Sequence, residues 1–297
     1  MIRNFADLRT RVKEKPARTI AVVCPEGEEV IKLIARALES RIAEFILLGD
    51  PEAIRALAAG QLDLGRVELI ATKEPRAAAE EAVRLVVAGR AQALMKGNLP
   101  TATFLKAILD KQQGLHASRL ISEVTLLEKG GEEGLQLLTD CAINIAPTLE
   151  EKVQIIENAV ALARRLGYHR PRVAVLSAVE LVNPALPDTI DAAVLSKMAD
   201  RGQIKDAVVD GPFALDNALS REAAQYKKIG GEVAGQADIL LAPNLQVGNA
   251  LHKALVFWAH RPIATAVLGA RAPIIMTSRS DSMQTMLDTV ALAAYIS

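Results

Sequence analysis

The sequence predicts an α/β protein built from two lobes with mostly parallel sheets. Short runs of β-branched residues or leucine alternate with helical stretches rich in alanine, glutamate and arginine, and turns with glycine, proline, aspartate or asparagine separate them. The chain has 297 residues, which exceeds the length at which a single hydrophobic core usually stops growing. Apolar residues make up 51% of the chain, so each lobe can bury a core of its own.

The first part of the chain predicts a parallel sheet covered by helices. Strands are expected at 19–24, 44–48, 67–71 and 93–96. Between them, apolar residues recur at three- and four-residue spacing over 28–41, 51–59 and 75–88, which is typical of amphipathic helices. The strands are continuous apolar runs, so we expect both faces of the sheet to be buried.

The pattern changes after residue 109. Segments 119–127 and 135–139 flank the turn-forming stretch 129–134, which predicts an antiparallel hairpin. Thr148 is followed three residues later by Glu151, and this spacing predicts a capped helix over 149–166. We place a lobe boundary at this point.

A second strand–helix series follows the boundary. Strands are expected at 172–177, 207–209, 239–242, 264–268 and 273–277, and a closing helix at 281–294. Clefts between such lobes are common ligand sites.

Composition argues against several classes of function. Basic and acidic residues balance at 35 each, unlike the basic excess of a nucleic-acid-binding protein. Cys24 and Cys141 are far apart and lack metal-ligand spacing, so neither a disulfide nor a zinc site is indicated. Residues 1–15 do not resemble a signal peptide, and the longest apolar runs are too short to cross a membrane. We therefore expect a cytoplasmic protein without a nucleic-acid or membrane partner.

Polar residues that follow the predicted strands are the candidate site, because open α/β sheets bind ligands at the carboxyl ends of their strands. These candidates are Lys96, Gly97, Asn98, Thr101, Asp210, Gly211, Pro212, Asp216, Asn244, Gly248, Asn249, Ser278 and Arg279. Each segment also has a purely structural interpretation, and spacing alone does not decide between the two.

The first and last of these segments suit an anion. Gly97 permits a close backbone approach, and Thr101 or Asn98 lies near the start of a following helix, whose free amide donors favour a phosphate. An ordinary strand-to-helix turn is the alternative. Arg279 suits bidentate phosphate binding, or else a surface ion pair, while Ser278 is equally compatible with a capping turn.

The middle segments are open to the same two interpretations. We interpret Asp210-Gly211-Pro212 as a tight turn leaving a strand, after which Asp216 orients a substrate or satisfies loop amides. Gly248 and Asn249, downstream of Asn244, bring backbone close to a ligand or form an irregular helix entry.

Read together, long segments of the chain resemble the phosphate acetyl/butyryltransferase family. They are LMKGNLPTATFLKAILDK (94–111), TDCAINIAPTLEEK (139–152), KMADRGQIK (197–205), VDGPFALDNALS (209–220) and TSRSDS (277–282). The resemblance covers nearly the whole chain, and the order, spacing and length of the segments are most similar to the butyryl-transferring members.

This resemblance implies a fold and a reaction. The fold is one α/β domain at 1–147 plus 267–297, a second at 148–266 inserted into it, and an active-site cleft between them in a homodimer. The reaction is acyl-CoA plus phosphate to acyl phosphate plus coenzyme A, by direct transfer in a ternary complex, without a metal or other cofactor. By resemblance, Ser278 contacts the sulfur of coenzyme A, and Arg279 contacts the phosphate and the developing negative charge.

Two positions depart from the pattern of acetyl-specific relatives. Thr285 stands where those relatives have an aspartate proposed as the base for coenzyme A, so the base is unassigned, although Asp281 lies nearby. Leu105-Lys106 replaces an arginine followed by proline, and either Lys96 or Lys106 is a candidate for the missing charge. The alternatives to butyryl transfer are a phosphate acetyltransferase, a metal-dependent two-lobed dehydrogenase and a non-catalytic coenzyme A-binding protein.

Overall fold

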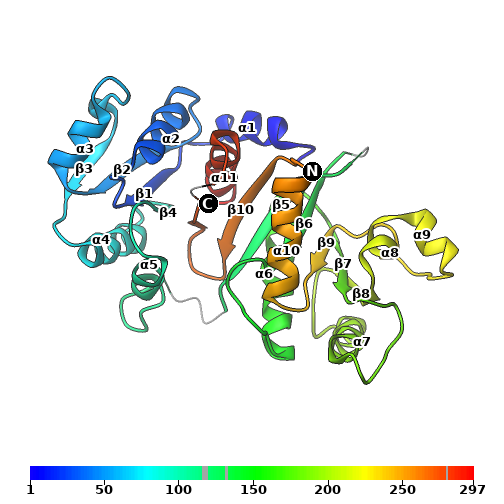
Figure 1. The fold of residues 1–297 in the computed structure, drawn as a ribbon. Coiled ribbons are helices and arrows are strands. Elements are labelled where there is room, and N and C mark those ends of the chain that lie inside the picture. The colour runs from blue at the N-terminus through cyan, green and yellow to red at the C-terminus, as the bar shows by residue number, and fades with distance from the viewer. Residues whose placement is uncertain (116–119, 131–132, 279) are drawn as a thin grey trace. The chain divides into compact units, whose positions relative to one another are not determined.

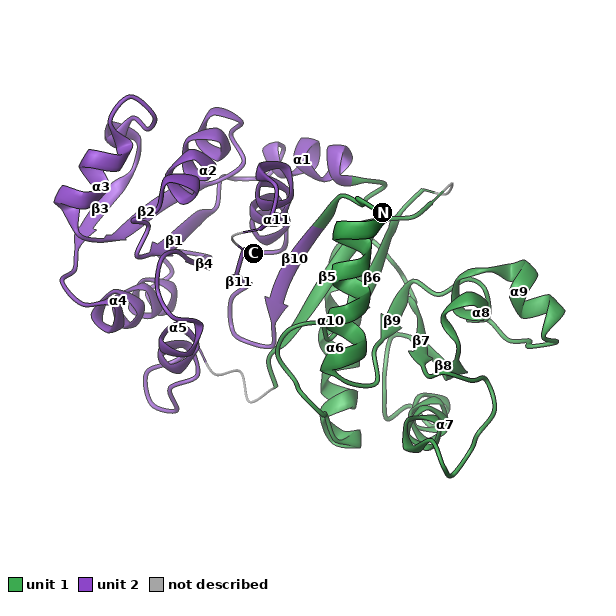
Figure 2. Cartoon of the chain, viewed as in Figure 1, with its two compact units in different colours: residues 1–4, 120–263 green, residues 5–119, 264–297 purple. Residues whose placement is uncertain are grey.

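The computed structural model describes residues 1–115, 120–130, 133–278 and 280–297 (Figure 1). It divides into two compact units, coloured separately in Figure 2. Unit 1 comprises residues 1–4 and 120–263, and unit 2 comprises residues 5–119 and 264–297. Within the described residues, no helix combines the length and apolar character needed to cross a membrane.

Unit 2 contains a sheet with the strand order β3-β2-β1-β4-β11-β10. Its strands are β1 (Thr19–Val23), β2 (Glu44–Gly49), β3 (Glu68–Ala71), β4 (Ala93–Lys96), β11 (Ile274–Ile275) and β10 (Ile263–Leu268), whose first residue belongs to unit 1. Strands β1 to β4 and β11 are parallel, whereas β10 pairs antiparallel with β11. The expected parallel sheet is confirmed, with β10 as the exception because only a short loop joins it to β11.

The helices of unit 2 lie on both faces of this sheet. They are α1 (Phe5–Lys13), α2 (Glu28–Glu39), α3 (Pro51–Ala58), a short 3₁₀ turn at Leu64–Arg66, α4 (Pro75–Val87), α5 (Thr101–Ile108) and α11 (Met283–Ile296). Helices α1, α2 and α11 pack together on one side, and α4 packs with α5 on the other (Figure 1). An Arg9–Asp288 ion pair, in which Asp288 is buried, joins α1 to α11.

Unit 1 contains the strand order β5-β6-β9-β7-β8. The strands are β5 (Ser122–Glu128), β6 (Leu135–Thr139), β7 (Arg172–Leu176), β8 (Val208–Phe213) and β9 (Ile239–Leu241). The antiparallel β5–β6 hairpin is confirmed for the described residues, and residue 119 of the expected first strand lies outside them. Strand β6 pairs parallel with β9, β9 pairs parallel with β7, and β7 pairs parallel with β8.

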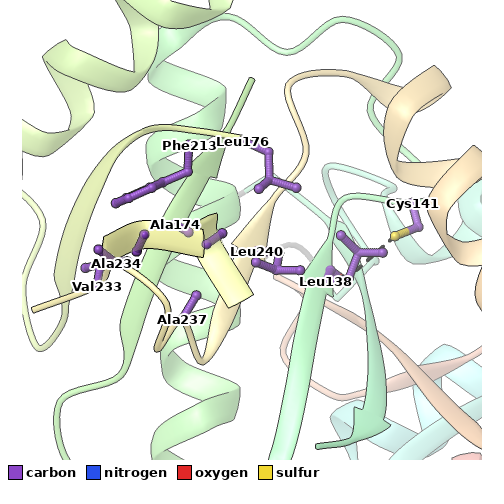
Figure 3. Close-up of a cluster of buried hydrophobic side chains, with 11 residues drawn as sticks. Leu138, Cys141, Ala174, Leu176, Phe213, Val233, Ala234, Ala237 and Leu240 are labelled. Carbon is purple, nitrogen blue, oxygen red and sulfur yellow. Dashed lines mark hydrogen bonds between the residues drawn. The ribbon is translucent and has the colours of Figure 1, made fainter. Parts of the chain in front are cut away.

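The helices of unit 1 are α6 (Leu149–Arg165), α7 (Pro187–Asp200), α8 (Leu215–Leu219), α9 (Arg221–Tyr226), α10 (Leu245–Lys253) and a π-helical turn at Ala254–Trp258. The capping box predicted for α6 is present, since Thr148 Oγ1 accepts from the Glu151 amide and the Glu151 carboxylate accepts from the Thr148 amide. Figure 3 shows part of the core, where Leu138, Leu240 and Ala174 from three adjacent strands belong to one buried cluster with Phe213.

The units divide at different residues from the boundaries that we expected at 147/148 and 266/267. The hairpin explains the difference. Strand β6 pairs directly with β9, from Leu137 opposite Ile239 to Thr139 opposite Leu241, so the hairpin belongs to the same unit as β9.

Candidate functional site

Three strands of unit 2 end at the same edge of its sheet and bring several candidate residues together. Val23 of β1 pairs with Lys96 of β4, and Ile275 of β11 pairs with Met95 of β4. The segment 277–278 therefore leaves β11 beside the turn that follows Lys96. The structure thus places Ser278 at the edge that also carries Lys96, Gly97, Asn98 and Thr101.

The turn after β4 lies directly on the end of β1. The amide of Gly97 donates to Val23 O at 2.8 Å, and the amide of Asn98 donates to Cys24 O at 2.6 Å. A Cβ atom on Gly97 would lie 2.1 Å from Cys24 O and 2.6 Å from Val23 O. Only glycine fits at position 97, because two backbone segments approach too closely there to leave room for a side chain. The Asn98 side chain adds to this contact by donating to Glu26 O at 3.2 Å.

The same turn leads into the start of a helix, as expected. Helix α5 begins at Thr101, with Pro100 at its N-cap, and the first amides of any helix lack partners within it. Lys96 lies at the end of β4, half-buried, with its ammonium 3.3 Å from Gly97 O. A helix start beside a lysine favours an anion through its amide donors and its positive charge.

Ser278 is held by a tight turn. Its amide donates to the Asp281 carboxylate at 2.7 Å, and the Asp281 amide donates back to Ser278 O at 3.1 Å. The Ser278 and Ser280 hydroxyls are 2.9 Å apart. Arg279 lies outside the described residues. Ser282 is the N-cap of α11, and its hydroxyl accepts from the Thr285 amide at 3.1 Å.

Lys106 occupies a different environment from Lys96. It lines a cavity of about 530 Å³ between α4 and α5, together with Arg76 and Thr103. Arg76 in this cavity already forms an ion pair with Glu80 at 2.7 Å.

In unit 1, the expected turn at Asp210-Gly211-Pro212 is wrong, because all three residues belong to β8. Proline has no amide to donate, and β8 tolerates it as the last strand in the sheet order. The Asp210 carboxylate accepts from the Gly211 amide at 2.8 Å, and burial raises the pKa of Asp210.

Asp216 lies in the first turn of α8. It accepts from the Asn217 amide at 2.8 Å and pairs with Lys227 at 3.1 Å, and this hydrogen bond from Lys227 lowers the pKa of Asp216. The interpretation that Asp216 satisfies local amides is thus observed.

The segment from Asn244 to Asn249 packs against the end of β6. Asn244 is the N-cap of α10 and accepts from the Val247 amide at 3.0 Å. A Cβ atom on Gly248 would lie 2.1 Å from Asp140 O, and Asn249 donates to Cys141 O at 3.1 Å. These residues therefore fix the loop after β6.

The sequence interpretation missed a buried polar chain beside this loop. Glu123 on β5 accepts from Thr125 Oγ1 at 3.0 Å, and Thr125 Oγ1 lies 2.9 Å from Nδ1 of His252 on α10. Burial, together with the smaller effect of the nearby Asp140 charge, raises the pKa of Glu123 to about 8. The sequence SEVTLLE of β5 gave no sign that Glu123 is buried, because burial on both faces of a strand is a tertiary property.

Replacing Glu123 by glutamine should change the pH dependence of stability. The folded protein holds a proton on Glu123 up to about pH 8, whereas the unfolded chain releases it near the ordinary pKa of 4.5. The Glu123 contribution to the free energy of unfolding therefore falls as the pH rises through this window, by about 1.4 kcal/mol per unit of pKa shift. Glu123→Gln removes this loss, so its stability relative to the wild type should rise with pH.

Urea unfolding at about pH 5 and about pH 9 measures this difference. The control is Glu222→Gln, which changes an exposed carboxylate in the same unit. A Glu123→Gln curve that runs parallel to the wild-type curve across this range contradicts the burial argument.

A family model and several known proteins match this chain over most of its length. The family model described as "Phosphate acetyl/butaryl transferase" matches residues 70–294. The phosphate butyryltransferase of Clostridium beijerinckii is 45% identical over 297 residues, covering 100% of this chain and 98% of the relative. The phosphate acetyltransferase of Rhizobium meliloti is also 45% identical, over 95% of this chain and 89% of its own.

A solved structure agrees with these sequence matches. The branched-chain phosphotransacylase from Enterococcus faecalis V583 is 34% identical and superposes with a TM-score of 0.84, covering 94% of this chain and 98% of its own. The mostly parallel α/β fold is thus the fold of this neighbour as well. The chain belongs to the phosphate acetyl/butaryl transferase family.

Proposed function

We propose that this protein is a phosphate butyryltransferase, which converts butanoyl-CoA and phosphate into butanoyl phosphate and coenzyme A. The observation that carries this proposal is the 45% identity to the Clostridium beijerinckii enzyme over 100% of this chain and 98% of that enzyme. The enzyme of Rhizobium meliloti reaches the same identity but extends further beyond the matched region. Acetyl transfer is therefore the second candidate.

The proposed reaction needs one bond exchange. An oxygen of phosphate attacks the thioester carbonyl carbon, the C–S bond breaks, and the sulfur of coenzyme A leaves and takes up a proton. We assign phosphate binding to Arg279 and the Lys96–Gly97 turn, because fixed positive charge and amide donors stabilise the negative charge of the tetrahedral transition state. Ser278 contacts the sulfur or the thioester. The reaction proceeds by direct transfer in a ternary complex.

Several further properties belong to this proposal. The site uses no metal and no cofactor, because substrate binding and charge stabilisation are sufficient for a direct transfer. Coenzyme A or phosphate is also bound by residues of unit 1, namely Asp210, Gly211, Pro212, Asp216, Asn244, Gly248 and Asn249. Asp281 positions Ser278 through the amide contact at 2.7 Å. The enzyme acts as a homodimer in the cytoplasm.

Purified protein with butanoyl-CoA and phosphate should release free thiol without added metal. Relative rates with acetyl-, propionyl- and butanoyl-CoA identify the acyl preference, since one methylene changes discrimination by about 1–3 kcal/mol. Thiol release is followed with a disulfide reagent, and omission of phosphate is the control. The proposal is overturned if no short acyl-CoA gives phosphate-dependent thiol release. A change in nicotinamide absorbance after addition of a nicotinamide cofactor and a divalent metal would indicate a dehydrogenase instead.

A further inference from the structure

A second cavity of the protein lies in unit 1, at the edge of the sheet opposite the loops that follow β6 and β9. The amino ends of β6, β7 and β9 meet the carboxyl end of β5 there, and the cavity measures about 340 Å³. It is within the usual size range for small-molecule pockets, which begins near 300 Å³. None of the candidate residues of the proposed phosphorolysis lines it.

Four cationic side chains line this cavity, namely Lys129, Arg172, Arg221 and Arg261. Among the described residues, the carboxylates beside them are Glu128, which also lines the cavity, and Asp238. Burial opposes ionisation of Asp238, but hydrogen bonds from Arg172 and Lys129 hold its pKa below the ordinary value. With both carboxylates ionised, two positive charges remain in excess.

Hydrogen bonds to Asp238 and Gln236 hold three of these cationic side chains in place. Asp238 accepts from Lys129 at 2.6 Å and from Arg172 at 2.9 and 3.0 Å. Gln236 Oε1 accepts from Arg172 at 2.9 Å and from Arg221 at 2.7 Å. Two guanidinium groups are thereby fixed around one amide oxygen, which lowers the conformational entropy that a bound anion would have to remove.

A buried amide donor in the same cavity also points to a ligand. Gln136 at the start of β6 lines the cavity and is only 7% exposed, yet its Nε2 has no hydrogen-bond partner. Leaving a buried donor unpaired is unfavourable, and such groups are rare in folded proteins. A turn of the Gln136 side chain toward the cavity would let a bound oxygen atom accept from this donor, and the surrounding cations would neutralise its charge.

We propose that this cavity binds a small multivalent oxyanion, such as a polyphosphate or polycarboxylate group. The site is separate from the phosphorolysis proposed above and does not depend on it. The anion contacts Arg221 and the Gln136 amide, with Arg172 and Lys129 supplying positive charge beneath it.

Isothermal titration calorimetry of the full chain with tripolyphosphate, and separately with citrate, tests the proposal. At least one of the two probes should bind. Arg221→Gln should weaken that binding about tenfold or more, because a charge-assisted hydrogen bond is lost. Gln136→Leu should weaken binding while leaving the melting temperature of the unliganded protein unchanged or higher, because it removes an unpaired buried donor.

The matched control is Arg170→Gln, which removes the same charge from an exposed residue of unit 1 that pairs with Glu232 at 3.6 Å. It should bind the probe as the wild type does. The proposal is overturned if neither probe binds, or if binding survives unchanged in both Arg221→Gln and Gln136→Leu. In the second case the heat comes from the phosphate site of the proposed reaction.

Discussion

Phosphorolysis of butanoyl-CoA by Ser278→Ala is expected to be slower than that of the wild type by about 10² to 10³-fold, by analogy with the loss of one oxyanion-hole donor. The Ser278 hydroxyl lies at the strand edge shared with Lys96 and Gly97, where it can donate a hydrogen bond in the transition state. Some activity should remain, because direct attack by phosphate needs no acylated serine. Steady-state thiol release measures the loss.

Two observations would separate this role from others. Ser280→Ala removes a hydroxyl 2.9 Å from the Ser278 hydroxyl and should reduce the rate much less. An equal loss would assign the effect to the turn rather than to Ser278. Rapid mixing of wild-type protein with butanoyl-CoA in the absence of phosphate should give no thiol burst. A stoichiometric burst with butyryl mass on the Ser278 peptide would show that the serine is a covalent nucleophile.

Gly97→Ala should have the largest effect on stability among single methyl additions at the unit 2 edge. The new Cβ would lie 2.1 Å from Cys24 O and 2.6 Å from Val23 O, and neither backbone oxygen can rotate away. The turn after β4 must therefore move and lose its hydrogen bonds to β1. We expect a loss of about 3 kcal/mol in the free energy of unfolding, measured in urea, together with reduced phosphorolysis.

Gly230→Ala is the matched control, since its Cβ would meet nothing within 4 Å and its φ is not in the left-handed region. It should leave the free energy of unfolding within about 0.5 kcal/mol of the wild type. A Gly97→Ala variant that unfolds at the same urea concentration as this control would mean that the turn adapts at no cost.

The strands were predictable because their signal is local. Runs such as the one in β1 are apolar throughout, and turn residues such as Asp50 and Gly97 bound them. Helix α1 was not predicted, because alternating charges hide its apolar stripe. Phe5, Leu8 and Val12 nevertheless recur at helical spacing and are all buried, so a count of periodicity in this segment would have found the helix.

The rest of the fold depends on contacts distant in sequence. The continuation of β8 through Pro212 is possible because β8 is the terminal strand in its sheet order, and strand order cannot be inferred from residues 208–213 alone. The same reason applies to Glu123. Its raised pKa results from burial and from Asp140, which the hairpin brings beside it across the sheet.

The candidate site was predictable as a set of segments but not as a set of contacts. The rule that strand ends carry ligands selected the Lys96 turn and Ser278, and pairing of β4 with β11 places them at one edge. The sequence interpretation considered a ligand as the partner of Gly248, whereas the structure places the backbone of Asp140 against it. A glycine indicates that two segments approach closely, without indicating which ones.

The pairing of β4 with β11 affects how unit 2 folds during translation. Strand β4 pairs with β11, which is synthesised only after residues 120–263 of unit 1 have been made as one block. Domains generally fold as units during translation, so unit 1 can fold while the β4 edge is still unpaired. An unpaired apolar strand edge is a template for aggregation. The edge of β4 therefore stays open to pairing with other chains until β11 has been made.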